Sequence, residues 1–448
     1  MDSRSPSDAR EQVETRSAGR GKRWATRALG FAPLIGMCAG VAVLVFSHGA
    51  ISPRAQMLIA WRHPLTVLVA VEAFYLALQT VLWLRYRPAP PLADAELPRL
   101  SVIIPAFNEG PMVERSIRSV ADAEYPRDRL EIIVVDDGSR DDTLFHMRKL
   151  RRTYPELVRV LHFPGNQGKR AALRAGFLAA AGDVVLTVDS DSEMGPDTLR
   201  RMVAPFANAR VGAVAGRIRV LNRDTFIGRM LEVQFTLSFD FARAAQSAYG
   251  TVMVCPGALS AFRRAVIVPH LDAWMDQRFL GRPVGHGEDQ ALTNVVLRAG
   301  YDTVYQRDAA VWTLVPDRYR QLTRMLLRWD RSFLVEGFSF ARFMFKRCRP
   351  RGRVLPVIAL LCSNLRLVLL FVALSQVPSL LAGEPRQLSH VLAAAAIAAL
   401  GSALYYLRTE RSLRFLYGAV YALYSLLLLQ WILPWAIFTV RDERWGTR

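Results

Sequence analysis

Cysteine is scarce in this chain of 448 residues. The four cysteines, Cys38, Cys255, Cys348 and Cys362, are far apart and show no CxxC spacing. A disulfide framework needs several paired cysteines in a short secreted chain, and a structural zinc site needs closely spaced ligands. Neither is expected here, so we predict reduced thiols in a cytosolic or membrane setting.

The sequence also lacks the signatures of nucleic-acid binding, although its formal net charge is +19. It has no zinc-finger spacing, no RNP-like aromatic motif and no long basic stripe. The positive charge comes almost entirely from arginine, and part of it is what basic flanks of membrane segments would carry. We expect anionic membrane lipids and anionic substrates as partners and no nucleic acid. No pattern predicts an oligomeric state.

Apolar residues make up 52% of the chain and are concentrated at its two ends. Residues 1–27 are polar and arginine-rich, as in a disordered cytosolic tail. Residues 28–87 contain the apolar runs Ala28–Phe46 and Pro64–Leu84, each about long enough to cross a bilayer of about 30 Å. The first run is long for a signal peptide and a second run follows it, so we predict two transmembrane helices. Arginines flank the pair, which favours a cytosolic N-terminus.

Apolar segments return over residues 354–440. Five full spans would place residues 441–448 outside the cell, yet this tail contains three arginines. The last apolar run also contains Pro434. We therefore expect transmembrane and interfacial helices in which one segment lies at the interface or re-enters. The prediction is a multi-pass protein of the plasma (inner) membrane with a cytosolic catalytic domain.

Between these ends, residues 99–318 show short apolar runs that alternate with amphipathic stretches. This alternation predicts an α/β, Rossmann-like domain with a mostly parallel sheet covered by helices. Ligands bind such sheets beyond the carboxyl ends of the strands. The runs of this domain that are expected as strands are Leu100–Pro105, Leu130–Val135, Leu157–Phe163 and Val184–Val188.

After this domain, residues 319–353 are expected to form amphipathic interface helices.

Polar residues follow all four expected strands. They are Asn108-Glu109, Asp136 to Ser139, Gly165 to Arg170, and Asp189-Ser190-Asp191. One Asp-x-Asp is weak evidence, because helix caps and chance produce many, but four such strand ends at one edge predict a ligand site. Asp137 can accept from a base or ribose, and Lys169 and Arg170 can meet a diphosphate. Asp189 and Asp191 can hold Mg²⁺ or Mn²⁺ against it.

Glu288 and Asp289 come just before a segment with a helical pattern. An interaction with the positive N-terminal end of that helix would by itself explain one of the two carboxylates. The alternative is a catalytic base, since a sugar hydroxyl that attacks an anomeric carbon must lose its proton. We favour Asp289 for this role. In the amphipathic stretch Tyr319–Phe340, Arg328 suits a diphosphate and Trp329 suits a pyranose ring, although an interfacial anchor would also explain the tryptophan.

Together these motifs resemble the family 2 glycosyltransferases and, more narrowly, the bacterial hyaluronan synthases. The resemblance covers about residues 65–448. It implies a GT-A fold, UDP-sugar donors, a divalent metal, inversion at the anomeric carbon, and a growing polysaccharide that leaves processively through the enzyme's own membrane channel. The matching segments are Phe239 to Ser247, Val254 to Ser260, Gly287 to Asn294, and Trp445 to Arg448.

The same resemblance implies roles for individual residues. The catalytic pair is Asp289, the base, with Glu288, and the metal ligands are Asp189 and Asp191. Cys255 and Trp329 border the acceptor sugar, and Trp445, Gly446, Thr447 and Arg448 form a gating tail on the cytosolic side. The UDP-sugar site comprises Ala106, Asn108, Glu109, Asp137, Lys169, Arg170, Asp189 and Arg328.

Two positions near the expected acceptor site depart from the family pattern. Met325 stands where the family's Gln-x-x-Arg-Trp motif has glutamine, and Pro256 to Ala258 replaces Ser-Gly-Pro. The expected product is hyaluronan, made from UDP-GlcNAc and UDP-GlcA. The alternatives are a chitooligosaccharide, another uronate-containing β-glycan, or an export protein whose transferase domain is catalytically impaired.

Overall fold

The computed structural model describes residues 31–46, 64–344, 352–375, 378 and 385–442. The predicted tail over residues 1–27 and the segment Trp445 to Arg448 lie outside these residues. The chain divides into two compact units. One comprises Met1–Thr80 and Leu365–Tyr424, and the other comprises Val81–Asn364 and Ser425–Arg448.

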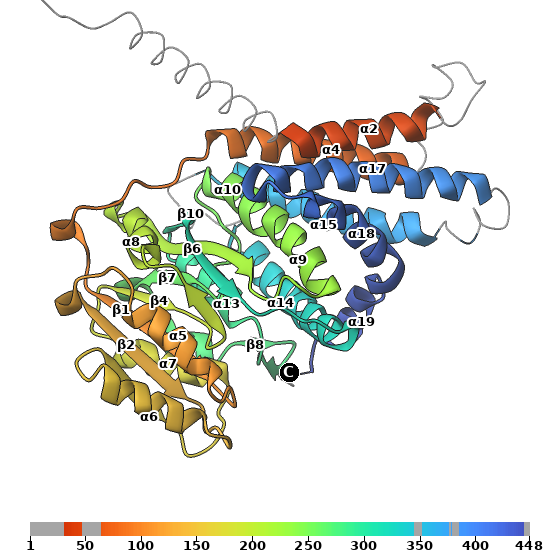
Figure 1. Cartoon of the computed structure of the whole chain (residues 1–448). Coiled ribbons are helices and arrows are strands. Elements are labelled where there is room, and N and C mark those ends of the chain that lie inside the picture. Colours follow the sequence, from red (N-terminus) through yellow and green to blue (C-terminus); the bar gives the residue numbers. More distant parts are fainter. Residues whose placement is uncertain (1–30, 47–63, 345–351, 376–377, 379–384, 443–448) are drawn as a thin grey trace, which may run out of the picture. The chain divides into compact units, whose positions relative to one another are not determined.

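The larger unit is built on an eight-stranded sheet with the order β3-β2-β1-β4-β7-β6-β10-β5 (Figure 1). Its strands are β1 (Leu100–Ala106), β2 (Leu130–Asp136), β3 (Val158–His162), β4 (Val184–Thr187), β5 (Ser192–Met194), β6 (Val211–Val220), β7 (Ser260–Arg263) and β10 (Asp302–Thr313). A separate small hairpin joins β8 (Arg278–Phe279) to β9 (Arg282–Pro283).

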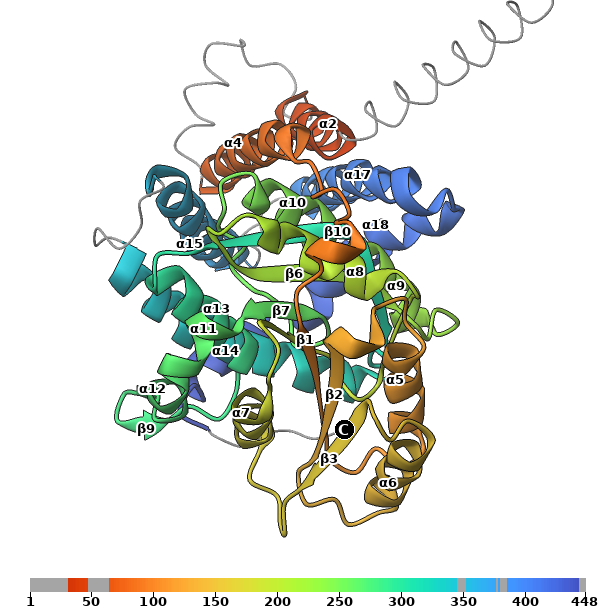
Figure 2. The same cartoon turned by 90° about the vertical axis from the view of Figure 1, so that its left-hand side faces the viewer.

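The first four strands confirm the predicted parallel arrangement. They are rich in β-branched residues, and β1 and β4 are buried throughout, as expected for a sheet covered on both faces. Helices α5 (Met112–Ala121) and α6 (Thr143–Thr153) lie on one face, and α7 (Lys169–Ala179) lies on the other (Figure 2). The sheet is mixed beyond them, because β7 runs antiparallel between β4 and β6, and β5 runs antiparallel to β10.

Helices of the second half bring the remaining site residues to the sheet. α9 (Phe226–Thr236) continues through a π-helical turn, Leu237–Phe241, into α10 (Ala242–Ser247). The apolar contact of α13 (Glu288–Arg298) with α14 (Tyr319–Met344) includes buried Leu297, Phe340 and Met344. The other short helices of this unit are α8 (Thr198–Val203), α11 (Arg264–Ile267), α12 (Leu271–Met275) and α19 (Ile432–Phe438).

In the smaller unit, α2 (Ala32–Phe46) packs along α17 (Pro385–Glu410). Their backbones approach closely at two glycines, because a Cβ on Gly36 would lie 2.4 Å from the Cα of Gly401. α4 (Pro64–Arg85) begins in this unit, and its Glu72 forms an ion pair with Arg366 of α15 (Val354–Ser375). The unit ends with α18 (Tyr417–Tyr424).

Among the described residues, one helical segment, Val354–Val372, is long and apolar enough to cross a membrane. A second candidate is the pair Leu413–Leu429 and Ile432–Phe438, which bends by 45° and has the form of a broken span or a re-entrant loop. The expected re-entrant C-terminal segment is compatible with this bend.

Candidate active site

A small pocket opens where the carboxyl ends of β1 and β4 meet the first turns of α7 and α13. Four ionisable side chains meet there, contributed by three separate segments of the chain. The lining residues are Pro105, Lys169, Leu173, Thr187, Asp189, Gly257, Ser260, Phe262, Glu288, Asp289 and Leu292. The fold therefore brings together the polar ends of distant strands and helices, as the sequence predicts.

Lys169 connects two of the predicted site residues. Its Nζ lies 2.6 Å from Oδ1 of Asp189 and 3.0 Å from Oε1 of Glu288. Burial opposes the ammonium charge, but the two carboxylates outweigh this effect and raise the pKa of Lys169. A permanent cation thus stands at the first turn of α7, next to the loop that follows β4.

Asp289 is held by backbone donors. The amides of Gln290 and Gly257 donate to its two carboxylate oxygens at 2.8 Å and 3.2 Å. Burial, together with the neighbouring Glu288 carboxylate, raises the pKa of Asp289 to about 6. A carboxylate with this pKa is ionised at neutral pH and is a better proton acceptor than an ordinary aspartate.

Glu288 has the opposite electrostatic environment. Burial opposes its ionisation most strongly, but Lys169 and Arg328 overcome that effect and hold its pKa below the ordinary value. Two adjacent carboxyl groups with pKa values pushed in opposite directions are typical of a catalytic site. Glu288 is positioned to keep Lys169 in place, whereas Asp289 is the group suited to proton transfer.

The end of β2 forms a tight turn around Asp137. Its carboxylate accepts from the amides of Gln167 and Gly168 at 2.8 Å and 2.9 Å. Its own amide donates to the carbonyl of Ala106 at 2.9 Å, which joins the ends of β1 and β2. Gly138 has φ +70°, and a Cβ there would lie 2.4 Å from the backbone of Gly165. Only glycine allows this approach.

The loop after β1 is tied to the loop after β2. Asn108 has φ 55°, its amide donates to Oγ of Ser139 at 3.0 Å, and its Oδ1 accepts from the amide of Arg140 at 2.8 Å. The amides of Glu109 and Gly110 both donate to Oγ1 of Thr143 at 2.8 Å. These bonds hold both loops in one conformation.

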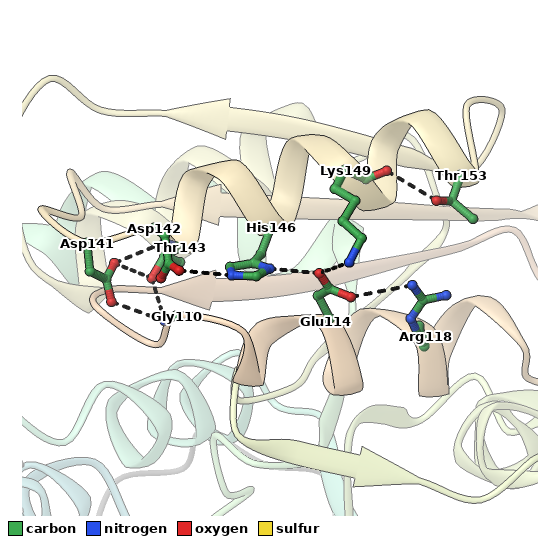
Figure 3. A network of polar contacts seen from close by, with 9 residues as sticks. All are labelled: Gly110, Glu114, Arg118, Asp141, Asp142, Thr143, His146, Lys149 and Thr153. Carbon is green, nitrogen blue, oxygen red and sulfur yellow. Dashed lines mark hydrogen bonds and ion pairs between the residues drawn. The ribbon is translucent and has the colours of Figure 1, made fainter.

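A charged network between α5 and α6 supports these loops from outside (Figure 3). Glu114 lies 2.6 Å from Nζ of Lys149 and 2.7 Å from Nδ1 of His146, whose Nε2 lies 3.2 Å from Asp142. Burial favours protonation of Glu114, but the hydrogen bonds from Lys149 and His146 lower its pKa to about 2. Glu114 therefore remains ionised over the physiological range.

Asp189 and Asp191 can provide only part of a metal coordination sphere. No group of three or more His, Cys, Asp or Glu side chains within the described part of the chain is arranged to hold a metal. Asp189 is bound to Lys169, and Oδ1 of Asp191 accepts from Oγ1 of Thr313 at 3.2 Å. Two carboxylates fit Mg²⁺ or Mn²⁺ if diphosphate oxygens complete the shell, as in many nucleotide sites.

The sequence predicts that Arg170 meets the diphosphate together with Lys169, but the side chain of Arg170 does not line the pocket. Its guanidinium is buried and donates to the carbonyls of Trp274 and His286 at 2.9 Å and 3.2 Å, and to Oε1 of Gln277 at 3.0 Å. Successive residues of a helix point about 100° apart, so Arg170 leaves the face that Lys169 occupies. Its hydrogen bond to the carbonyl of His286 holds the backbone just before Glu288 in place.

The predicted acceptor residues occupy different environments. Trp329 is 38% exposed, and its ring lies 6.1 Å and 6.2 Å from the rings of Phe235 and Phe239. Cys255 is fully buried, which raises the pKa of its thiol to about 12, and its amide donates to Oγ1 of Thr293 at 2.9 Å. Cys255 is therefore placed to shape the site through its backbone.

The sequence assigned no role to Glu336, a buried carboxyl on α14. It accepts from Nε2 of Gln277 at 2.5 Å and from Nδ2 of Asn294 at 2.8 Å. Through Gln277 it continues the contacts of Arg170, so α7, α13 and α14 are joined by one buried polar chain. An isolated acid on an amphipathic helix gives no signal of this kind in a sequence.

Comparisons with known proteins identify the family. The sequence model of Glycosyl transferase family 2 matches residues 101–269. An N-acetylglucosaminyltransferase of Azorhizobium caulinodans is 31% identical over 361 residues, 78% of this chain and 87% of the relative. One of Rhizobium meliloti is 38% identical over 253 residues, 56% of this chain, and the match spans only 59% of that protein.

One further relative bears on the family, and one solved structure bears on the fold. A hyaluronan synthase of Streptococcus pyogenes is 30% identical over 361 residues, 78% of this chain and 83% of the relative. A mannosyltransferase of Pyrobaculum calidifontis, solved with GDP-Man and Mn²⁺, superposes with a TM-score of 0.55 at 23% identity and covers 81% of this chain and 98% of its own. That likeness shows the fold. The chain is a GT-A enzyme that belongs to the family 2 glycosyltransferases.

Proposed function

We propose that this enzyme is an inverting, metal-dependent transferase that builds a β-linked polysaccharide from UDP-sugars. The expected product is hyaluronan, made from UDP-GlcNAc and UDP-GlcA. The observation that carries the proposal is Asp289, a buried carboxylate with a pKa of about 6 that lines the same pocket as Lys169 and Asp189. A proton acceptor next to a diphosphate-binding cation is the combination that glycosyl transfer requires.

The transfer follows from these positions. The acceptor hydroxyl oxygen attacks the anomeric carbon from the face opposite UDP, its proton passes to Asp289, and the bond from that carbon to the diphosphate breaks. Lys169 stabilises the negative charge that develops on the leaving UDP, and Asp137 holds the nucleoside. Asp189 and Asp191 would hold Mg²⁺ or Mn²⁺, which when bound neutralises diphosphate charge.

The acceptor side is assigned to the aromatic surface of α14. Trp329 offers a ring face for a sugar, and Arg328 contributes positive charge next to Glu288. We further propose that the product leaves through the enzyme's own membrane helices and that the donors bind on the cytosolic side. The bent pair at Leu413–Phe438 and the polar ion pair of Glu72 with Arg366 support this assignment.

A chitooligosaccharide is the second candidate product. The two rhizobial relatives, at 38% and 31% identity, are named N-acetylglucosaminyltransferases. A product made from GlcNAc alone would use the same base and the same diphosphate contacts. The two products differ in whether UDP-GlcA is required.

The test uses membranes that contain the full-length protein and labelled UDP-GlcNAc and UDP-GlcA, supplied singly and together with Mn²⁺. Polymer that needs both donors and is cleaved by a hyaluronan lyase supports hyaluronan, and oligosaccharide from UDP-GlcNAc alone supports the second candidate. The control is Asp289→Asn, which should abolish transfer but retain UDP binding. Failure of both donors with Mn²⁺ present, or full activity with excess chelator, would contradict the proposal.

A further inference from the structure

Arg243 of α10 is a buried guanidinium without a polar partner. The residue is 5% exposed, and its Nη1 is buried with no hydrogen-bond acceptor. No hydrogen bond or ion pair to Arg243 occurs within the part of the chain that the structure describes. Arg170 and Arg331 are similarly buried, but each donates to protein oxygens. Leaving a charge buried and unpaired is costly, so an unpartnered arginine indicates that a ligand supplies the acceptor.

The side chain of Arg243 instead packs against an aromatic cluster that consists of Phe235, Phe239 and Trp329. Its guanidinium carbon lies 4.2 Å from the centre of the Phe239 ring, and Phe239 lies 4.6 Å from Phe235. Both phenylalanines contact Trp329, the ring assigned to the acceptor sugar. The π-helical turn at Leu237–Phe241 separates Phe235 from Arg243, and such turns are frequent at functional sites.

Arg243 also lies close enough to the base for their charges to interact. Burial lowers the pKa of Arg243 to about 10, and the neighbouring Tyr305, Cys255 and Asp289 act against this effect. The guanidinium therefore remains charged at neutral pH. In the proposed function Lys169 provides the positive charge for the diphosphate, on the donor side, so the positive charge of Arg243 is available to the acceptor.

The chemistry of the ligand follows from the guanidinium. Its N–H groups form a planar fork that matches two oxygens of a carboxylate or the oxygen of an amide carbonyl. Phe239 occupies one face of the cation, so the ligand must approach along an edge. A uronate carboxylate and the acetamido carbonyl of an N-acetylhexosamine share this chemistry, whereas simple ring hydroxyls are weaker acceptors.

We propose that Arg243 binds a carbonyl or carboxylate oxygen of the acceptor sugar while that sugar stacks on Trp329. The proposal rests on the glycosyl transfer proposed above and deepens it, because it names the group by which the acceptor is selected. Arg243 contacts the acceptor and takes no part in proton transfer.

The experiment measures acceptor KM for the detergent-solubilised, full-length enzyme with two acceptors, N-acetylglucosamine and a glucuronate-ended oligosaccharide. Arg243→Met removes the donors and keeps an apolar side chain, and Arg243→Lys keeps the charge but loses the fork. The matched control is Arg174→Met, because among the described residues the polar contact of Arg174 is an exposed ion pair with Asp272. UDP affinity and thermal unfolding are measured for every variant.

We expect Arg243→Met to raise the KM of one acceptor about tenfold or more, with an intermediate rise for Arg243→Lys and none for Arg174→Met. A rise confined to N-acetylglucosamine assigns the carbonyl, and one confined to the glucuronate acceptor assigns the carboxylate. UDP affinity should stay within about twofold of the parent. Unchanged KM values for both acceptors, or a parallel loss of UDP affinity and thermal stability, would overturn the proposal. If the parent enzyme uses neither acceptor, the proposed function fails instead.

Discussion

The pH dependence of transfer should report the interaction between Glu288 and Asp289. Burial and the Glu288 charge raise the pKa of Asp289 from 3.8 to about 6, while Lys169 acts against them. As the proposed base, Asp289 accepts a proton only when it is ionised, so activity should fall as the pH drops through about 6. Glu288→Gln preserves the shape of the side chain and removes one negative charge. It should therefore move this acid limb to lower pH.

The size of the effect follows from the titration. With a pKa of about 6, Asp289 is ionised in about one molecule in eleven at pH 5, so the rate should fall about tenfold between pH 7 and pH 5. With the ordinary pKa of 3.8, about nine-tenths of the base would still be ionised at pH 5. Glu288→Gln should retain a larger share of its own neutral-pH rate at pH 5 than the parent enzyme.

The assay is the initial rate of UDP release over about pH 4.5 to 8, at saturating donor and Mn²⁺ so that weaker donor binding does not distort the profile. Arg174→Met serves as the control with a parental profile. An acid limb at the same pH in Glu288→Gln and in the parent would refute the electrostatic reasoning. A parent enzyme without any acid limb near pH 6 would remove Asp289 as the titrating base.

Three further predictions concern the scaffold. Gly138→Ala should weaken UDP binding, measured by calorimetry, and cost about 1–3 kcal/mol of stability, because its Cβ would lie 2.4 Å from Gly165 at φ +70°. Glu336→Ala should lower stability by about 2–4 kcal/mol in thermal unfolding, because it leaves the side-chain amides of Gln277 and Asn294 buried without an acceptor. Glu336→Gln should cost less, because the neighbouring amides can reorient toward the new side chain. Gly401→Leu should lower the unfolding temperature in detergent, because its Cβ would lie 2.1 Å from Gly36, while Gly352→Ala, with nothing within 4 Å, should not.

The parallel strands and their polar ends could be predicted from the sequence because both follow local rules. Apolar runs of the right length identify β1 to β4, and parallel strands end at the same edge of a sheet. The antiparallel strand β7 could not be predicted in the same way. Its place between β4 and β6 depends on pairing with residues distant in the chain, which no local pattern shows.

The direction of individual side chains was also beyond the sequence. Lys169 and Arg170 are adjacent and both are positively charged, yet of the two Lys169 lines the pocket, while Arg170 donates to the carbonyls of Trp274 and His286. Arg243 belongs to a recognisable motif, but its lack of a partner is visible only when the surrounding residues are placed. Residue type predicts which interactions a side chain can form, whereas the packing of the fold decides whether the side chain lines the pocket.

The buried chain from Arg170 through Gln277 and Glu336 to Asn294 has a consequence for ionic conditions. Dissolved ions screen exposed charges over about 10 Å at 0.1 M salt but act far less on groups shielded from water. Raising the ionic strength should therefore weaken the capture of the anionic donor while leaving the spacing between Asp289 and Trp329 unchanged. Salt would then slow the loading of the enzyme without altering the geometry in which each linkage forms.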